Sequence, residues 1–322
     1  MRLRLVPEET HIDFFKARKV TFGASMILMV LSLVAWMVMG LNFGIDFRGG
    51  TTIRTQSVHA VDVGAYRDAL QPLNLGDVAI SEVFDPTFAE DHNVAMIRIQ
   101  AQEGEESVTN ETIQSVETAL QGVDPDIQFT SVESVGPKVS AELIRTAVLA
   151  VGISLIAIMF YIWLRFEWQF SLGAVVALFH DVILTIGIFS VLQIRFDLAT
   201  IAALLTIVGY SINDTVVIFD RVRENLIKYK TKPLQDVMNL SVNETLSRTV
   251  MTSGTTLIAL IALLILGGDV IRGFVFAITW GVIVGTYSSV YVAKNIVLML
   301  GTKRDWSKPS KTEGNQYANI DN

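Results

Sequence analysis

The sequence predicts an α-helical membrane protein, in which six transmembrane helices carry one exported α+β domain. Hydrophobic residues make up 51% of the 322 residues and the mean hydropathy is +0.46, values that indicate a chain folded largely in lipid. The hydrophobic residues also gather into long blocks and do not recur at the spacing of a single helix face. One long polar stretch, residues 42–142, interrupts these blocks.

Six hydrophobic blocks are long enough to cross about 30 Å of hydrocarbon as helices. The first block follows a basic tail and has no small-residue cleavage site after it, so we expect a retained anchor and not a cleaved signal peptide. The predicted spans are Val20–Leu41, Leu143–Leu164, Phe170–Leu192, Leu198–Phe219, Val250–Leu266 and Phe274–Leu300.

Composition excludes several classes of function. The chain has no cysteine, so disulfides, thiolate metal sites and cysteine nucleophiles are excluded. Its net charge of −7 and isoelectric point near 5.2 do not show the excess of positive charge that is typical of nucleic-acid-binding proteins. The four histidines are scattered along the chain, which argues against a histidine-built metal centre.

Lysine and arginine predict the orientation, because positive charge in short loops tends to stay in the cytoplasm. The tail 1–19 holds five such residues, the connecting loop 221–249 holds six and the tail 301–322 holds four. These three segments are therefore predicted to be cytoplasmic, with the helical bundle 143–300 between them. The polar stretch 42–142 is then exported, and in a bacterium it is a periplasmic domain on the inner (cytoplasmic) membrane.

The exported domain alternates between strand-like and helix-like segments. Their order is β-α-β-β-α-β, which is typical of the ferredoxin-like split βαβ arrangement. We find no set of catalytic residues in it and interpret it as a domain that binds another polypeptide. The segments span residues 51–56, 61–70, 77–83, 93–100, 108–120 and 127–135.

Two predicted spans carry charge in their interior: His180 and Asp181 in the third, and Asn213 and Asp214 in the fourth. A charged side chain at a helix centre costs about 2.5–3.5 kcal/mol even on lenient scales, so it usually has a partner or a function. Counted by helix rise from the cytoplasmic ends, Asp181 lies about 16 Å deep and Asp214 about 10 Å. We interpret Asp214 as functional, whereas His180 and Asp181 could equally be a pair that satisfies itself.

Arg248 is the candidate partner of Asp214, because it opens the fifth span and an arginine there can reach inward to a carboxylate. Lys294, in the sixth span, is expected to snorkel to the cytoplasmic surface. Asp220 and Arg221 lie at the membrane boundary, where we expect an interfacial ion pair. Together, Asp214, Arg248, Asn213, Asp181 and His180 form a predicted proton relay, since intramembrane carboxylates often exchange protons.

Three glycines, Gly44, Gly49 and Gly50, lie between the first span and the exported domain. Glycine adopts backbone conformations that other residues avoid. The segment is either a hinge that transmits motion to the domain or a turn.

Several segments together resemble a known family: FGIDFRGGT (43–51), GPKVS (136–140), RFEW (165–168), ALFHDV (177–182), VGYSINDTVVIFDRVREN (208–225) and SRTVMTSGTTL (247–257). The chain is similar to the SecF family of protein-export membrane subunits, within the SecD/SecF family of the resistance-nodulation-division (RND) superfamily. The resemblance runs from about residue 14 to about residue 304. Arg48 differs from the residue found before the double glycine in some relatives.

This resemblance implies an RND-type half-transporter whose six spans pair with six of SecD around a pseudo-two-fold axis. SecD and SecF use proton flow to move their exported domains and help release preproteins from the SecYEG channel after SecA has acted; YajC is a further expected partner. Asp214 and Arg248 match the family's relay positions, with SecD supplying another aspartate. No cofactor is implied beyond protons and the membrane potential, and no enzyme activity.

Three alternatives remain open. Two aspartates on adjacent spans could form an intramembrane aspartyl hydrolase, although the VGYSIND segment lacks the expected glycine–aspartate pattern. The chain could instead be a scaffold that only stabilises SecD or the channel. An RND-type exporter half for small molecules is the third, although its exported domain would normally be larger.

Overall fold

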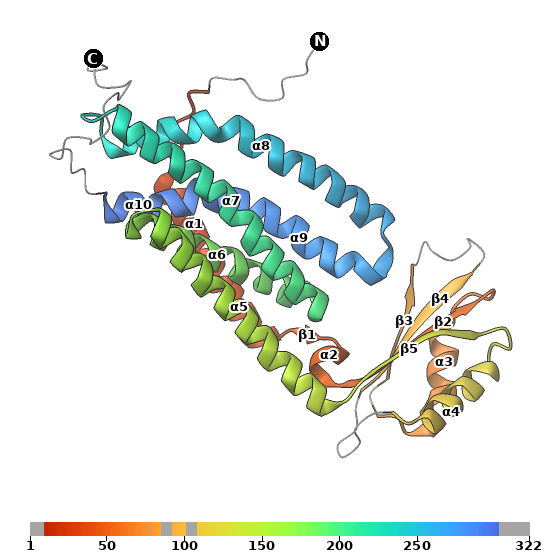
Figure 1. Ribbon diagram of the computed structural model, residues 1–322. Helices are drawn as coiled ribbons and strands as arrows, with labels where there is room; N and C mark the ends of the chain where they lie inside the picture. The colour runs from red at the N-terminus through yellow and green to blue at the C-terminus, as the bar shows by residue number, and fades with distance from the viewer. Residues whose placement is uncertain (1–9, 77, 85–91, 101–107, 303–322) are drawn as a thin grey trace, which may run out of the picture.

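The computed structural model describes residues 10–76, 78–84, 92–100 and 108–302. Parts of both predicted tails therefore lie outside the described residues. Figure 1 shows a bundle of long helices with a small α+β domain at one end, which we call the domain end.

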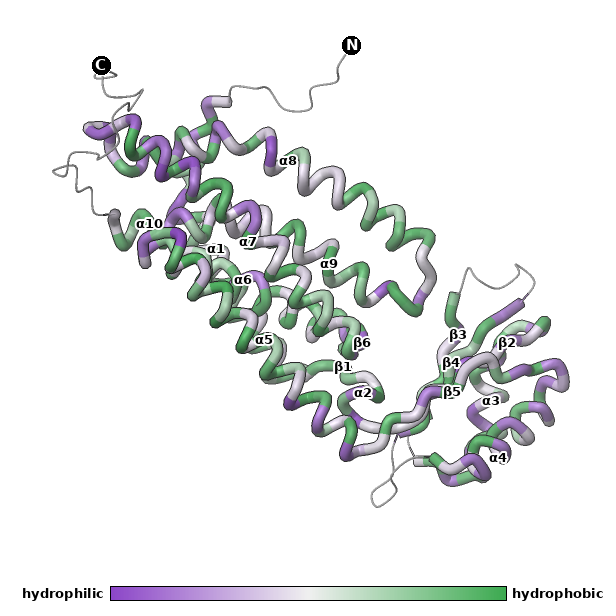
Figure 2. The backbone as a smooth tube through the Cα atoms, in the orientation of Figure 1, coloured by the Kyte–Doolittle hydropathy of each residue, from purple (hydrophilic) through white to green (hydrophobic). Residues whose placement is uncertain are grey.

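Six helical spans are long and apolar enough to cross a membrane, which confirms the predicted fold class. The last is interrupted by a π-helical segment, Ser289–Ala293. Figure 2 shows hydrophobic residues along the helices and hydrophilic residues concentrated at the ends of the bundle. The helices are α1 (Arg18–Met39), α5 (Pro137–Arg165), α6 (Trp168–Leu192), α7 (Leu198–Lys228), α8 (Leu234–Leu266), and α9 (Gly268–Ser288) continuing into α10 (Lys294–Leu300).

The predicted loop 221–249 is wrong, because most of it is helical. Helix α7 continues to Lys228 and α8 begins at Leu234, so only residues 229–233 connect them. Ion pairs from Arg221 to Glu224 at 2.7 Å and to Glu244 at 2.6 Å join the two polar helix ends. Hydropathy marks the part of a helix that lipid surrounds, and it does not register a helix that continues into water.

The ferredoxin-like domain is confirmed. Its antiparallel sheet has the strand order β3-β4-β2-β5, with α3 and α4 on one face (Figure 1). Asp62 caps α3 by accepting a hydrogen bond from the amide of Ala65, and Thr109 caps α4 in the same way. The elements are β2 (Gly50–Ser57), α3 (Val63–Leu70), a 3-10 turn (Gln71–Leu73), β3 (Val78–Val83), β4 (Asn93–Gln100), α4 (Asn110–Gln121) and β5 (Gln128–Val135).

The chain enters and leaves this domain beside the bundle. After α1, strand β1 (Asn42–Phe43) pairs in parallel with β6 (Arg195–Phe196) of the α6–α7 connection, and α2 (Ile45–Arg48) follows. At the far edge of the sheet, Phe84 and Asp269 exchange two hydrogen bonds, from the Phe84 amide to the Asp269 carboxylate at 2.6 Å and from the Asp269 amide to the Phe84 carbonyl at 2.8 Å. The domain is thus tied to the α8–α9 turn as well as to the chain that enters it.

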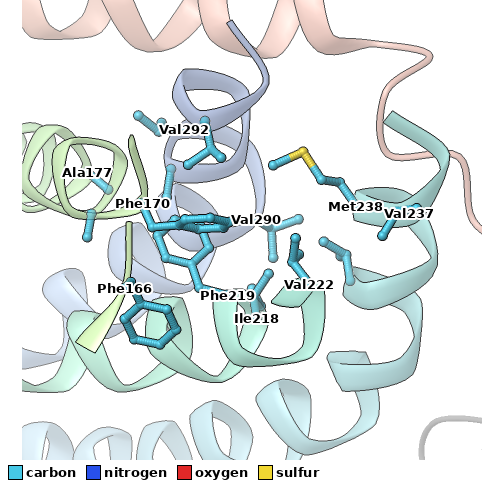
Figure 3. Close-up of a cluster of buried hydrophobic side chains, with 14 of the residues drawn as sticks. Phe166, Phe170, Ala177, Ile218, Phe219, Val222, Val237, Met238, Val290 and Val292 are labelled. Carbon is cyan, nitrogen blue, oxygen red and sulfur yellow. The ribbon is translucent and has the colours of Figure 1, made fainter. Parts of the chain in front are cut away.

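The largest hydrophobic core is built by side chains of α5, α6, α7, α8 and the π-helical segment, and Figure 3 shows a close-up of it. Phe170 of α6 and Phe219 of α7 stack edge to face at 5.0 Å between ring centroids. Residues 10–16 also belong here, because Phe14 and Phe15 are buried in this core. Asn243 of α8 holds that segment by accepting a 2.8 Å hydrogen bond from the amide of Ile12 and donating one to its carbonyl.

Candidate functional site

Asp181 is the most enclosed carboxylate of the bundle, with no exposed surface. Its Oδ2 atom accepts hydrogen bonds from Ser211 of α7 at 2.6 Å and from Ser288 of α9 at 2.8 Å. Its Oδ1 atom lies 3.0 Å from Nδ1 of His180, which is equally buried. Three helices therefore converge on one carboxylate, and each supplies it with a hydrogen-bond partner.

Glycine allows this convergence. A Cβ atom on Gly285 of α9 would lie 3.0 Å from Cβ of Ser211 and 3.5 Å from Oδ2 of Asp181. One turn earlier, a Cβ on Gly281 would overlap Ile207, at 2.3 Å from Cγ1. Small residues let helices approach closely inside a membrane. The π-helical segment begins directly after Ser288, and such segments often occur at functional sites.

Asp214 lies almost one turn beyond Ser211 on α7 and has a different environment. It is 4% exposed, and its Oδ2 atom has no hydrogen-bond partner among the described residues. Ser253 of α8 lies beside it and shares a 2.7 Å hydrogen bond with Thr286 of α9. Asp214 is thus enclosed but incompletely satisfied, whereas Asp181 has three partners.

Arg248 of α8 acts on Asp214 through its charge, but no ion pair of 4.0 Å or less joins them within the part of the chain that the structure describes. The Arg248 side chain is exposed on the surface of the bundle, as is Asn213. The five residues of the predicted relay therefore do not form one cluster. His180, Asp181 and Asp214 are buried in the helical bundle. Arg248 and Asn213 are exposed on its surface.

The sequence interpretation missed the contribution of the sixth span. Gly285, Thr286 and Ser288 belong to the run GTYSS, whose small and hydroxyl-bearing residues were the available signal. Several of the threonines that follow Arg248 bond within their own helix. Thr252 and Thr255, for example, donate to carbonyls of their own helix at 3.1 and 2.8 Å.

Comparison with known proteins shows the family of the chain. Residues 115–303 match the family of the protein-export membrane proteins SecD/SecF, C-terminal, and residues 34–61 match the SecD/SecF GG motif. The chain belongs to the SecD/SecF family. The region that matches the C-terminal family, residues 115–303, contains Asp181, Asp214 and the polar residues described around them.

Individual relatives agree with this assignment. The chain is 68% identical to the protein translocase subunit SecF of Cereibacter sphaeroides over 320 residues, 99% of each chain. It is 65% identical to that of Rhodobacter capsulatus over 318 residues, 97% of this chain and 96% of the other. The solved structure of SecDF from Thermus thermophilus, a translocon-associated membrane protein, matches with a TM-score of 0.81 at 35% identity. That match covers 93% of this chain and 40% of SecDF, so the chain spans about two fifths of the SecDF length.

The GG motif of the family has a clear structural basis here. Gly49 and Gly50 have φ angles of +74° and +134°, a region in which side chains are strained. Gly44 has an ordinary φ of −72°, but a Cβ there would lie 2.9 Å from Nε of Arg195. The three glycines are therefore needed for a turn and a close approach, and hinge motion at this segment stays a prediction.

Two further predictions are wrong for this SecD/SecF chain. Asp220 and Arg221 do not pair with each other, because consecutive helix residues do not face one another; Asp220 pairs with Arg165 at 3.3 Å and Arg221 with glutamates. Lys294 does not snorkel, because it is fully buried with its Nζ atom 4.0 Å from the centroid of the Phe15 ring. Aromatic rings of Phe14, Phe15 and Tyr291 take the place of water around the amino group of this side chain.

Proposed function

We propose that this chain is the SecF-type half of a SecD–SecF complex that uses the proton gradient to promote late preprotein translocation and release at the periplasmic side. The observation that carries this proposal is Asp214, an intramembrane carboxylate beside an exposed Arg248, with one oxygen that no described residue satisfies by a hydrogen bond. Unpaired charge is costly in lipid. Such a group is best explained as half of a site that another protein completes.

The face of α7 next to this site supports a helical partner. Ala202, Thr206, Gly209 and Asn213 are exposed, and their spacing of four, three and four residues places them on one side of the helix. Small residues on such a face permit close helix contact in a membrane. We assign this face to six spans of SecD, in agreement with the greater length of the SecDF chain.

The proposed orientation places the α+β domain in the periplasm and both chain ends in the cytoplasm of a bacterial inner membrane. Its support is the count of lysine and arginine given above. The wider partners of the complex are then the SecYEG channel and unfolded preprotein outside, SecA indirectly from the cytoplasm, and YajC.

The proposed mechanism couples proton transfer at Asp214 to the helices around it. Protonation removes the attraction between Asp214 and Arg248, and so changes how α7 and α8 pack against SecD. Ser253 and Thr286 join α8 to α9 at the same place, and the turn between α8 and α9 holds the α+β domain through Asp269. One charge that moves through 100 mV is worth about 2.3 kcal/mol, enough to bias a motion of a few kcal/mol.

Preprotein translocation into vesicles tests this proposal. In vesicles with the complete export machinery, Asp214→Asn is expected to abolish the stimulation of late translocation by the proton gradient, while Asp214→Glu retains part of it. Asp220→Asn is the matched control, because Asp220 lies on the same helix but pairs with Arg165 at the surface.

Two of the alternatives, the scaffold and the hydrolase, have their own outcomes in this experiment. Full stimulation in Asp214→Asn, with the complex with SecD intact, would leave only a scaffold role. Unchanged stimulation with loss of cleavage of a membrane peptide would instead indicate a hydrolase.

A further inference from the structure

A small cavity of about 150 Å³ lies where the chain leaves the bundle and enters the α+β domain. The connecting segment, residues 42–49, forms one side of it, and the start of β3 and the end of β4 form the other. Of the described residues that line it, two are arginines, Arg48 and Arg98, and none is acidic. The cavity is therefore a positively charged site that the proposed proton transfer does not use.

Both arginines lack a counter-charge within the described part of the chain. Neither forms an ion pair of 4.0 Å or less, or a hydrogen bond, with a residue that the structure describes. Arg48, directly before the double glycine, is exposed, and Arg98 of β4 is half-buried. Both side chains thus have surface that a ligand in the cavity can contact.

Arg98 also faces a second positive charge. Burial and the charge of Arg195, from the α6–α7 connection, lower the pKa of Arg98, and Asp197 opposes this effect. A guanidinium group that is partly removed from water beside a like charge is unfavourable unless an anion joins it. This arrangement indicates a site for an anion.

Two carboxylates near the cavity already have other partners. Asp197 accepts hydrogen bonds from the amide and the hydroxyl of Thr200, each at 2.9 Å, and so begins α7. It also lies 3.8 Å from Arg195. Asp46 accepts a hydrogen bond from the amide of Leu198 at 3.0 Å. Three arginines therefore share two carboxylates, which leaves an excess of positive charge at the cavity.

The location of the cavity indicates that the anion belongs to a lipid. The connecting segment begins three residues after α1 ends at Met39. The last turn of α1 is apolar and open, with Met37 and Val38 each 79% exposed. Lipid headgroups lie directly outside the hydrocarbon core, and arginine binds phosphate oxygens through two parallel hydrogen bonds. A phosphate in the cavity would therefore have its acyl chains beside the end of α1.

We propose that this cavity binds the phosphodiester of an anionic phospholipid from the leaflet on the domain side of the membrane. Arg48 and Arg98 hold the phosphate oxygens, and the apolar end of α1 accommodates an acyl chain. A headgroup of net negative charge is preferred to a zwitterionic one, because the second carries an ammonium group that the arginines repel. The site is independent of proton transfer at Asp214, and it fixes the start of the domain to the membrane surface.

Photolabelling of the full-length chain tests the proposal. The chain, co-purified with SecD where the two associate, is placed in nanodiscs of phosphatidylcholine with a trace of a lipid probe. The probe is phosphatidylglycerol or phosphatidylcholine, with the same diazirine near the glycerol end of one acyl chain. Peptide mapping is expected to place the phosphatidylglycerol label on the end of α1 and on residues 42–49, at about ten times the yield of the other probe. Unlabelled phosphatidylglycerol is expected to compete, and inorganic phosphate is not.

Variants locate the label in this cavity. The double change Arg48→Gln and Arg98→Gln removes both charges and is expected to abolish the preference for phosphatidylglycerol. Arg67→Gln, at an exposed arginine of α3 in the same domain, is expected to leave it unchanged. An undiminished preference in the folded double variant would overturn the proposal.

The unsubstituted protein decides the question even if the double variant fails to fold. Equal labelling by the two probes would overturn the proposal, because the segment would then contact lipid without regard to charge. Competition by inorganic phosphate would overturn the assignment to a lipid, since the cavity would then hold a free anion.

Discussion

At the scale of single residues, the two intramembrane aspartates differ in how they are accommodated. Asp181 is surrounded by Ser211, Ser288 and His180 and is fully buried. Asp214 has one oxygen without a hydrogen-bond partner in the described part of the chain, and it lies next to an exposed arginine. Asp181 is therefore suited to hold three helices together, and we propose that Asp214 exchanges a proton with a site on a partner.

The close contact at Gly285 can be tested by adding one methyl group. Gly285→Ala brings a Cβ to 3.0 Å from Ser211, and overpacking of this kind costs about 1–3 kcal/mol of unfolding free energy. Thermal unfolding in detergent measures the loss. The control is Gly254→Ala on α8, where a Cβ meets no atom within 4 Å and alanine is expected to be neutral or stabilising. Equal effects of the two changes would contradict the proposed role of close helix contact.

Tyr66 in the α+β domain provides a prediction for pH. Burial, together with the charge and the hydrogen bond of Asp124 at 3.1 Å, raises the pKa of Tyr66 to about 12. The folded state therefore holds this proton between pH 10 and 12, where the unfolded state has lost it, so the stability of the domain falls as the pH rises through that range.

Absorbance titration of the tyrosines measures this shift. One phenol is expected to ionise near pH 12, and Tyr66→Phe is expected to remove that step. Asp124→Asn should move the step to lower pH, because it removes the negative charge beside the phenol. Titration of all tyrosines near the ordinary value in the folded protein would refute this assignment.

At the scale of elements, two of the connections between the α+β domain and the bundle are a chain segment and a hydrogen-bonded contact; the chain also passes directly from β5 into α5. The GG segment carries the chain from α1 into β2, and the hydrogen bonds between Phe84 and Asp269 join the end of β3 to the α8–α9 turn. The second connection has no counterpart in the sequence motifs. It is the element through which a shift of α8 would reach the domain.

Asp269→Ala tests that second connection. The change removes the acceptor for the Phe84 amide and keeps the backbone hydrogen bond in the other direction. Hydrogen exchange at the end of β3 is expected to accelerate about tenfold, since one net hydrogen bond of about 1–1.5 kcal/mol is lost locally. Glu82→Ala, an exposed change on the same strand, is expected to leave that rate unaltered. No acceleration in Asp269→Ala would show that the contact does not hold the strand.

At the scale of the whole molecule, the sequence predicted those features that depend on hydropathy and on the local periodicity of the residues. The six spans follow from hydropathy, and the domain topology follows from alternating patterns. The lengths of α7 and α8 outside the membrane could not be predicted, because polar helix ends resemble loops in composition. The burial of Lys294 could not be predicted either, because Phe14 and Phe15 reach it from the other end of the chain.

The candidate site was predicted only in part, because some of its features are visible in the local sequence and others depend on how the helices pack. Buried charge is visible in a sequence, so Asp181 and Asp214 were found. The contributions of Gly285 and Ser288 depend on how closely α9 approaches α6 and α7, which no local pattern records. The lack of a direct ion pair between Arg248 and Asp214 within the described residues also depends on the packing, because the Arg248 side chain is exposed.

Proton flux through the purified complex with SecD tests the central claim most directly. In liposomes with a pH gradient and an internal pH-sensitive dye, the unsubstituted complex is expected to carry protons, and Asp220→Asn to carry them at the same rate. Asp214→Asn is expected to reduce the flux to that of empty liposomes while the complex remains assembled. Undiminished flux in the assembled Asp214→Asn complex would contradict the role that we assign to this carboxylate.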